Sequence, residues 1–269
     1  MKADQSSQAG DAAGAAEDGA QPGISRRRLF GIGAITLLGV DAIVKARHAG
    51  AGASPGSGRD PGGRTRSPEQ RVAAAPQYYI DDAGPMTIAL TLDDGPHPLY
   101  TPQVLEILQQ YGIQATFNMV GQQIGQNVSL VREVSASGHT ITNHTWDHAD
   151  MRKYSTAQVI SEIDRCNDAL AEAGQNPTIF RAPYGYWTPA VFEACGTRGL
   201  TPLGWSVDPQ DWDTAHVTTS DIVSKVLSQT RTHDIILEHD GGGDRSNTVA
   251  ALRIFIPELL GRGFVFAPV

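Results

Sequence analysis

From Met86 to the C-terminus, short apolar runs alternate with longer helix-like stretches, and this alternation limits the folds open to the chain. Seven runs have the length of buried strands, at 86–92, 115–120, 139–143, 178–182, 202–207, 234–238 and 264–268. The helix-like stretches between them include 102–111, 155–173, 189–198, 221–229 and 248–260. Strands joined by helical crossovers pair in parallel, so the pattern predicts a parallel α/β fold.

The number of strands favours a barrel over an open sheet. Seven strand–helix units packed into residues 86–268 predict a distorted (β/α)7 barrel, closed or nearly closed. The alternative, a doubly wound open sheet, would usually carry a glycine-rich phosphate turn after its first strand. Here Asp93-Asp94-Gly95-Pro96 occupies that turn. Within the helices, Ser155 with Gln158 predicts a capping box and Gly174 a helix stop.

Polar residues that can act in catalysis or bind a metal lie at or just past the carboxyl ends of these runs. They are Asp93, Asp94, His144, His148, Arg181, Asp208, Asp211, His239 and Asp240. In a barrel the carboxyl ends of the strands converge on one face, where active sites are assembled. Adjacent carboxylates such as Asp93 and Asp94 should also point in different directions, because side chains alternate along a strand. The pattern therefore predicts one active site at this face.

His144 and His148 are candidate metal ligands, because on a helical turn a four-residue spacing puts both imidazoles on one side. A lone pair of this kind is weak evidence. With an aspartate from a neighbouring strand end, it becomes two histidines and a carboxylate with an open fourth position, the layout of a catalytic zinc site. Nitrogen and oxygen ligands also suit cobalt, nickel or iron. A purely structural zinc site would not need an open position.

Five motifs, taken in order, give the chain a specific resemblance over about residues 80–269. They are Thr91-Leu-Asp-Asp-Gly-Pro96, His144-Thr-Trp-Asp-His148, Arg181-Ala-Pro-Tyr-Gly185, Asp208-Pro-Gln-Asp-Trp212 and Leu237-Glu-His239. The chain resembles the carbohydrate esterase family 4 polysaccharide deacetylases, which contain the NodB-homology domain. Leu92 and Ala149 depart from the usual Phe and Pro, and neither supplies a reacting group.

The resemblance implies a metal site and a base. Asp94, His144 and His148 would bind Zn²⁺, or another divalent metal such as Co²⁺ or Ni²⁺. Asp93 would be the general base for the attacking water. Arg181 would tether Asp93 and keep it ionised.

The resemblance also implies an acid and a binding pocket. His239 would be the general acid, with Asp211, preferred over Asp208, holding its imidazole. Tyr184 would donate its backbone N–H to the oxyanion. The walls of the acetyl pocket would be Trp212 and Leu237.

The first part of the chain predicts export. Residues 1–49 resemble a twin-arginine signal, with Arg26-Arg27-Arg28 ahead of a short apolar stretch. The alternative is a basic tail with an accidental apolar patch. Two small-x-small sites at 49–53 leave the cleavage position open. An uncleaved signal that stays as an anchor is an alternative. Residues 50–77 are rich in Gly, Pro and Ser and predict a linker, followed by the catalytic domain at 78–269.

Charge and cysteine content bear on the partners. Residues 76–269 hold 22 Asp and Glu against 11 Lys and Arg, which argues against a nucleic acid or an anionic membrane. A neutral polysaccharide is the expected partner. Membrane contact is expected only through the export signal, and the protein is expected to be a monomer. Cys166 and Cys195 form no metal-type motif; a disulfide in the exported protein and two free thiols both stay open.

The resulting expectation is a secreted or cell-surface enzyme that removes N-acetyl groups from a GlcNAc-containing cell-wall polysaccharide, with peptidoglycan preferred. Alternatives with the same chemistry are an O-acetyl esterase on acetylxylan and a chitin oligosaccharide deacetylase. A glycan-binding barrel that has lost catalysis would lack the base, the acid or a ligand, and none is missing.

Overall fold

The computed structural model of the protein describes residues 75–80 and 84–269, which form a curled, parallel, seven-stranded sheet flanked by helices. The strands are β1 (Thr87–Asp93), β2 (Thr116–Met119), β3 (Thr140–Asn143), β4 (Ile179–Phe180), β5 (Thr201–Pro202), β6 (Ile235–His239) and β7 (Val265–Phe266). Each lies within or next to a predicted run. The prediction of a distorted barrel of the (β/α)7 type is confirmed.

The strand β1 pairs with three other strands, β2, β6 and β7. The strand order is β5-β4-β3-β2-β1-β6, and β7 pairs with the first two residues of β1. All seven residues of β1 are buried, as expected for a parallel strand covered on both faces. Its last residue, Asp93, is in register with Asn118 of β2 and His239 of β6. Three strand ends are thereby brought together.

An irregular segment closes the ring where a longer strand was expected. The predicted run 202–207 is regular only at β5, yet Leu203 N donates to Phe180 O (2.9 Å) and Leu237 N donates to Val207 O (2.9 Å). Between them, Gly204 N bonds to Gln77 O, and Gly204 O accepts from the Arg181 guanidinium. Since these groups are bonded outside the strand ladder, the segment bends from β4 across to β6.

The helices lie in the intervals between the strands. They are α1 (Tyr100–Tyr111), α2 (Gly121–Ile124), α3 (Val128–Ala136), α4 (Thr156–Glu172), α5 (Pro189–Arg198), α6 (Thr219–Gln229) and α7 (Ser246–Gly261), with 3-10 turns η1 (Met151–Lys153) and η2 (Pro183–Gly185). The five predicted helices are present. The prediction did not include α2 and α3, although α3 buries Leu130, Val131 and Val134 at helical spacing.

The predicted ends of α4 are confirmed. Ser155 Oγ accepts from Gln158 N (3.4 Å), and Gln158 Oε1 accepts from Ser155 N (3.0 Å), which completes the capping box. Gly174 takes a left-handed φ of +81° just past the helix, the conformation that favours glycine at a helix stop.

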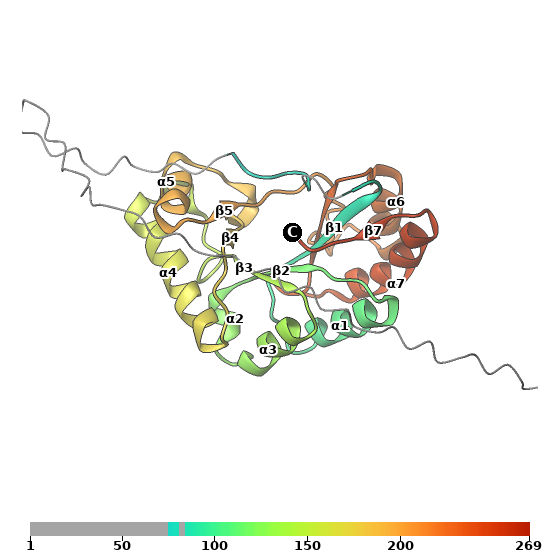
Figure 1. The fold of residues 1–269 in the computed structure, drawn as a ribbon, viewed down its shortest axis with the longest axis horizontal. Coiled ribbons are helices and arrows are strands. Elements are labelled where there is room, and N and C mark those ends of the chain that lie inside the picture. Colours follow the sequence, from blue (N-terminus) through green and yellow to red (C-terminus); the bar gives the residue numbers. More distant parts are fainter. Residues whose placement is uncertain (1–74, 81–83) are drawn as a thin grey trace, which may run out of the picture. The chain divides into compact units, whose positions relative to one another are not determined.

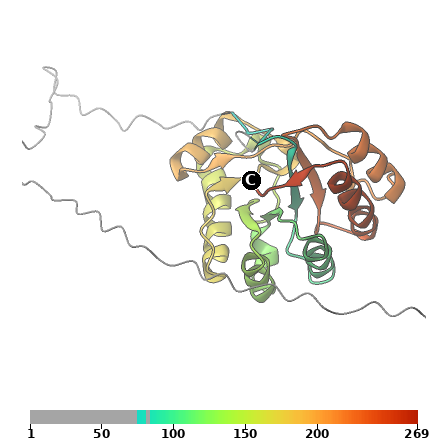
Figure 2. The same ribbon diagram turned by 45° about the vertical axis from the view of Figure 1, so that its right-hand side comes forward.

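The helices cover the outside of the curled sheet. Figure 1 shows α4 and α5 beside one end of it, α6 and α7 beside the other, and α1, α2 and α3 between, an arrangement that the turned view in Figure 2 keeps. The main core cluster fills the space between sheet and helices, with Leu90, Phe117, Val131 and Phe255 among its buried members. Within residues 75–80 and 84–269, no helix is both long and apolar enough to span a membrane.

Cys166 in α4 and Cys195 in α5 are buried free thiols that belong to different core clusters. Burial raises the pKa of each thiol to about 12. The predicted export signal at residues 1–49 and most of the predicted linker lie outside the residues that the structure describes.

Candidate metal centre and active site

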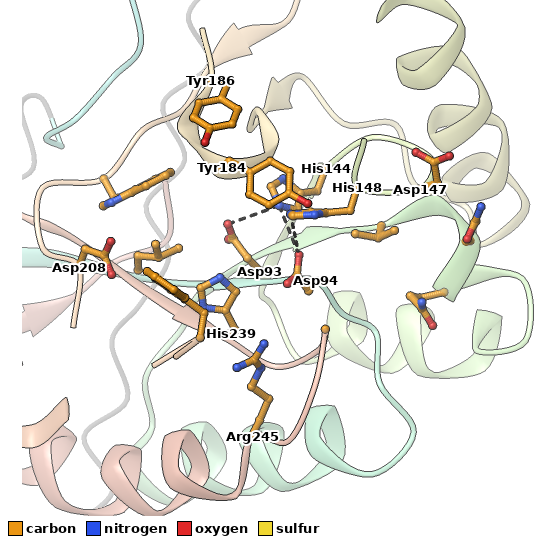
Figure 3. Close-up of a pocket in the computed structure, with 17 residues that line it drawn as sticks. Asp93, Asp94, His144, Asp147, His148, Tyr184, Tyr186, Asp208, His239 and Arg245 are labelled. Atoms are coloured by element: carbon orange, nitrogen blue, oxygen red, sulfur yellow. Dashed lines mark ion pairs between the residues drawn. The ribbon is translucent and has the colours of Figure 1, made fainter. Parts of the chain in front are cut away.

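The end of β1 sends two adjacent carboxylates to different neighbours. Asp93 is the last residue of the strand and is buried, and Asp94 follows it with a φ of +71°. Left-handed backbone at a non-glycine residue is uncommon and often marks a functional site. Figure 3 shows both carboxylates directed toward His144 and His148, with His239 on their other side.

Asp93 is held through one of its two oxygens. Its Oδ1 accepts from Arg181 Nη1 (2.7 Å) and from Asn118 Nδ2 (2.6 Å). The hydroxyl of Thr142 donates to Asn118 Oδ1 and so fixes which end of the amide faces Asp93. The other carboxylate oxygen, Oδ2, lies 3.6 Å from His144 Nε2. Asp93 therefore has one anchored oxygen and one that faces the site.

Arg181 is fully buried, which is costly for a guanidinium unless its donors are all used. Besides Asp93, it donates to Thr91 Oγ1 (2.7 Å), Gly204 O (2.8 Å) and, from Nε, Leu203 O (3.4 Å). Burial lowers the pKa of Arg181, and the charge of Asp93 opposes that shift. The arginine ties the carboxyl end of β1 to the segment that closes the barrel.

Asp94, His144 and His148 form a set that could hold a metal ion, with one ligand atom of each within 4.8 Å of the others. Asp94 Oδ1 lies 3.5 Å from His144 Nε2 and 3.2 Å from His148 Nε2. The same oxygen is buried and has no hydrogen-bond donor among the described residues. A carboxylate oxygen that faces two imidazole nitrogens suits a divalent cation, because the three atoms together supply N and O ligands.

The two histidines do not lie on a helical turn, and that expectation is wrong. Residues 144–150 form a loop in which Thr145 (φ +69°) and His148 (φ +60°) are left-handed. Thr145 N donates to Asn143 Oδ1 and His148 N to Thr145 Oγ1, so side chains take the place of helical acceptors. The loop still brings the two rings to a centroid distance of 5.0 Å.

The protonation of this set suits metal binding. His144 Nδ1 lies 2.8 Å from Arg181 O; a proton on Nδ1 would leave Nε2 free to act as a ligand. Burial alone would raise the pKa of Asp94, but the neighbouring His144 imidazole and the charges of His239 and His148 hold it below the usual range. Burial, together with the charge of His144, lowers the pKa of His148.

His239, the last residue of β6, is paired with Asp211 across a buried contact. Nδ1 of the imidazole lies 2.7 Å from Asp211 Oδ1, and Asp211 Oδ2 accepts from His239 N (2.9 Å) and Thr248 Oγ1 (2.7 Å). Burial would lower the pKa of His239, but attraction to Asp211 and to the Asp94 and Asp93 charges raises it to about 9. The imidazole is therefore charged at neutral pH. Asp208, the alternative partner, instead accepts from Gln210 N in a turn (2.8 Å).

A pocket of about 600 Å³ is lined by Asp93, Asp94, His144, His148 and His239, whereas Asp211 and Arg181 lie behind its wall. Its walls include the other predicted site residues, Tyr184, Trp212 and Leu237, and also Trp205 and Tyr186. Tyr184 lies in η2 with a φ of +59°, and its ring meets the edge of His148 at a centroid distance of 4.6 Å. Trp212 is 49% exposed and Leu237 is 3% exposed, so the Trp212 wall faces solvent and the Leu237 wall belongs to the core.

A glycine pair packs against Asp94, a role that the sequence did not reveal. A Cβ on Gly241 would lie 2.1 Å from Asp94 O, and one on Gly242 would lie 2.3 Å from Asp94 Oδ2. Gly242 also has a φ of +72°. Arg245 bonds to Gly241 O (2.6 Å) and to Asp211 O (3.2 Å), linking this loop to the His239 side of the pocket. The segment 241–246 therefore supports the candidate metal-binding set.

Comparison with known proteins agrees with this geometry. The polysaccharide deacetylase family model matches residues 81–203. A peptidoglycan-N-acetylglucosamine deacetylase of Bacillus cereus is 41% identical over 184 residues, which cover 68% of this chain and 85% of the relative. A chitooligosaccharide deacetylase of Bradyrhizobium is 38% identical over 208 residues, which cover 72% of this chain and 94% of the relative.

A solved structure, the family 4 carbohydrate esterase from Streptomyces lividans in complex with acetate, has a TM-score of 0.62 and 37% identity. The match covers 67% of this chain and 91% of that esterase. Sequence, fold and the Asp-His-His set agree. The chain therefore belongs to the polysaccharide deacetylase family, the metal-dependent hydrolases of carbohydrate esterase family 4 with the NodB-homology fold.

Proposed function

We propose that the protein removes N-acetyl groups from GlcNAc units of a cell-wall polysaccharide, with peptidoglycan as the preferred polymer. The observation that carries the proposal is the pairing of Asp93 and Asp94 at one strand end. Asp94 Oδ1 has no hydrogen-bond donor within residues 75–80 and 84–269 and faces two histidines, while Asp93 beside it is tethered by Arg181. Asp94 is thus suited to bind a metal, and Asp93 is suited to accept a proton.

Asp94, His144 and His148 would hold the metal, with zinc first and Co²⁺ or Ni²⁺ as alternatives. A divalent ion at this position supplies Lewis acidity, which lowers the pKa of a water and polarises the acetyl carbonyl. Asp93 accepts the proton of the attacking water on Oδ2, because Oδ1 is occupied by Arg181 and Asn118. These two donors also fix the carboxylate in place.

His239 donates a proton to the departing amine. The attraction to Asp211 keeps the imidazolium form present at neutral pH, so the proton is available when the tetrahedral intermediate collapses. Asp211 also fixes the ring, because it accepts from both the ring nitrogen and the backbone N–H of His239. Base and acid thus act from opposite sides of the pocket.

The remaining pocket residues bind the reacting group. The backbone N–H of Tyr184 stabilises the oxyanion, since a fixed donor is most effective where charge develops. The acetyl methyl lies between Trp212 and Leu237, both of which line the pocket. The aromatic rings of Tyr184 and Trp212, which are 55% and 49% exposed, offer surfaces for sugar rings.

The choice of polymer rests on location and on relatives. The twin-arginine-like segment at 1–49 would export a catalytic domain at 78–269, through a linker at 50–77, to the compartment where peptidoglycan is exposed. The Bacillus cereus relative is a peptidoglycan-N-acetylglucosamine deacetylase. The Bradyrhizobium relative is a chitooligosaccharide deacetylase, which makes chitin oligomers the second candidate.

A substrate panel tests the proposal. Acetate release is measured with added zinc from peptidoglycan, from chitin oligosaccharides and from acetylxylan, at equal acetyl concentrations. We expect the fastest release from peptidoglycan and none after chelation. Faster release from chitin oligosaccharides would overturn the polymer assignment but keep N-deacetylation. Release from acetylxylan alone would overturn N-deacetylation.

A further inference from the structure

The loop that carries two of the proposed ligands is held by a carboxylate that does not touch the metal set. His144 N still donates to Met119 O of β2 (3.0 Å), but residues 145–150 belong to no helix or strand. Instead, the backbone N–H groups of Trp146 and Asp147 both donate to Oε2 of Glu162, at 3.1 and 3.3 Å. Both donors lie between His144 and His148, at the middle of the loop.

Glu162 comes from the face of α4 that docks onto this loop, and only 7% of it is exposed. The next residue of the helix, Ile163, accepts through its carbonyl from Asn143 Nδ2 (2.9 Å), and Asn167 Oδ1 accepts from the same amide (2.8 Å). Asn143 in turn accepts from Thr145 N. The loop is thus fixed to α4 at its beginning by Asn143 and at its middle by Glu162.

The Glu162 carboxylate lies near that of Asp147, and the two backbone amides offset the repulsion between the two acids. Within the part of the chain that the structure describes, Glu162 pairs with Arg165, whose Nη1 lies 3.8 Å from Oε1 and whose side chain is half exposed. The guanidinium of Arg165 also lies 4.4 Å over the Trp146 ring. A nearly buried carboxylate with one distant cation depends on its two backbone donors, and those donors depend equally on it.

We propose that Glu162 is a positioning residue for the metal centre: it fixes the loop in the shape that points both histidines at Asp94. The inference rests on the proposed function of that centre. Without Glu162, two backbone N–H groups lose their acceptor and must find water or another oxygen. The left-handed residues Thr145 and His148 would then relax, and the imidazoles would separate.

Three variants of α4 separate positioning from packing. Glu162→Ala removes the acceptor, and Glu162→Gln keeps an acceptor oxygen without the charge. Asp168→Ala is the matched control, because Asp168 is an exposed carboxylate on the same helix. For each variant, zinc affinity is measured by competition with a chromophoric chelator. Amide hydrogen exchange at residues 146 and 147 is measured in the metal-free protein.

We expect Glu162→Ala to raise the zinc dissociation constant by roughly 10-fold or more, the usual cost of losing a residue that orients metal ligands. Amide exchange at 146 and 147 should become faster, and acetate release should recover at saturating zinc. Glu162→Gln should lose less affinity, and Asp168→Ala none. Unchanged zinc affinity in Glu162→Ala, or a loss of melting temperature without a loss of affinity, would overturn the proposal.

Two further outcomes are decided by the same panel. If Glu162→Ala fails to fold, Glu162→Gln decides: weakened affinity with faster exchange supports positioning, and wild-type values overturn it. If the wild-type protein binds none of Zn²⁺, Co²⁺ and Ni²⁺, the proposed function fails. The exchange at 146 and 147 in the metal-free protein then still tests whether Glu162 holds the loop.

Discussion

At the scale of single residues, Asp93 and Asp94 are neighbours in the chain, yet their carboxylates have different partners. Asp93 ends β1 and is held by Arg181 and Asn118, whereas Asp94 turns out of the strand toward His144 and His148. The left-handed backbone of Asp94, supported by the close packing of Gly241 and Gly242, produces this separation. Two acids at one strand end can therefore serve two chemical purposes.

The pH dependence of catalysis should report the pairing of His239 with Asp211. As pH rises through the His239 pKa of about 9, the proton needed by the leaving amine is lost, so activity should fall on the alkaline side. Asp211→Asn removes the attraction that raises this pKa, while burial, which lowers it, remains. We expect the alkaline limb of kcat/KM to move down by at least about one pH unit.

A pH–rate profile of acetate release from pH 6 to 10 measures this shift, with circular dichroism to confirm that the variant is folded. An alkaline limb that stays in place in Asp211→Asn would show that a different group controls it.

The residues that sequence reasoning found were those with distinctive chemistry at strand ends. Asp93, Asp94, His144, His148, Arg181, Asp211 and His239 do come together around one pocket. Asn118 and Glu162 were missed, because each acts through a contact made only after folding. Asn118 is a polar residue inside an apolar run, and that was its only signal. Glu162 looks like any glutamate of an amphipathic helix.

At the scale of elements, the loop between β3 and α4 shows why a spacing is not a conformation. A four-residue spacing fits a helical turn, but the hydrogen bonds of this loop go to Asn143, Thr145 and Glu162 instead of to helical carbonyls. Those acceptors belong partly to another element, so local sequence could not reveal them. The capping box and stop of α4 are local interactions, and both were predicted correctly.

Ser155→Ala tests whether stability and metal binding are separable within α4. Losing the N-cap should lower the free energy of unfolding by about 1 kcal/mol, and the melting temperature should fall by about 2–4 °C. Zinc affinity should be unchanged, because the contacts with the metal-binding loop lie further along the helix, at Glu162 to Asn167. Thermal unfolding of the metal-free protein and chelator competition measure the two quantities. A weakened zinc affinity would mean that the helix end also controls the loop.

At the scale of the whole molecule, the parallel barrel gathers the site. The register of β1 with β2 and β6 puts Asn118 and His239 on either side of Asp93. Arg181 reaches the same point from the end of β4. Strand number and direction followed from the alternation of apolar runs. The way the ring closes did not, because the segment from Leu203 to Val207 is held by Gln77, Arg181 and β6 and not by a regular ladder.

The assignment of Asp93 as the base is the central claim, and Asp93→Asn tests it most directly. An amide keeps the size of the side chain but cannot take the proton of the attacking water. Acetate release and zinc content are measured on the same samples, with Asp208→Asn as the same change in the same pocket. We predict that Asp93→Asn loses at least about 100-fold in kcat and keeps its zinc, while Asp208→Asn loses much less. Wild-type turnover in Asp93→Asn would contradict the account.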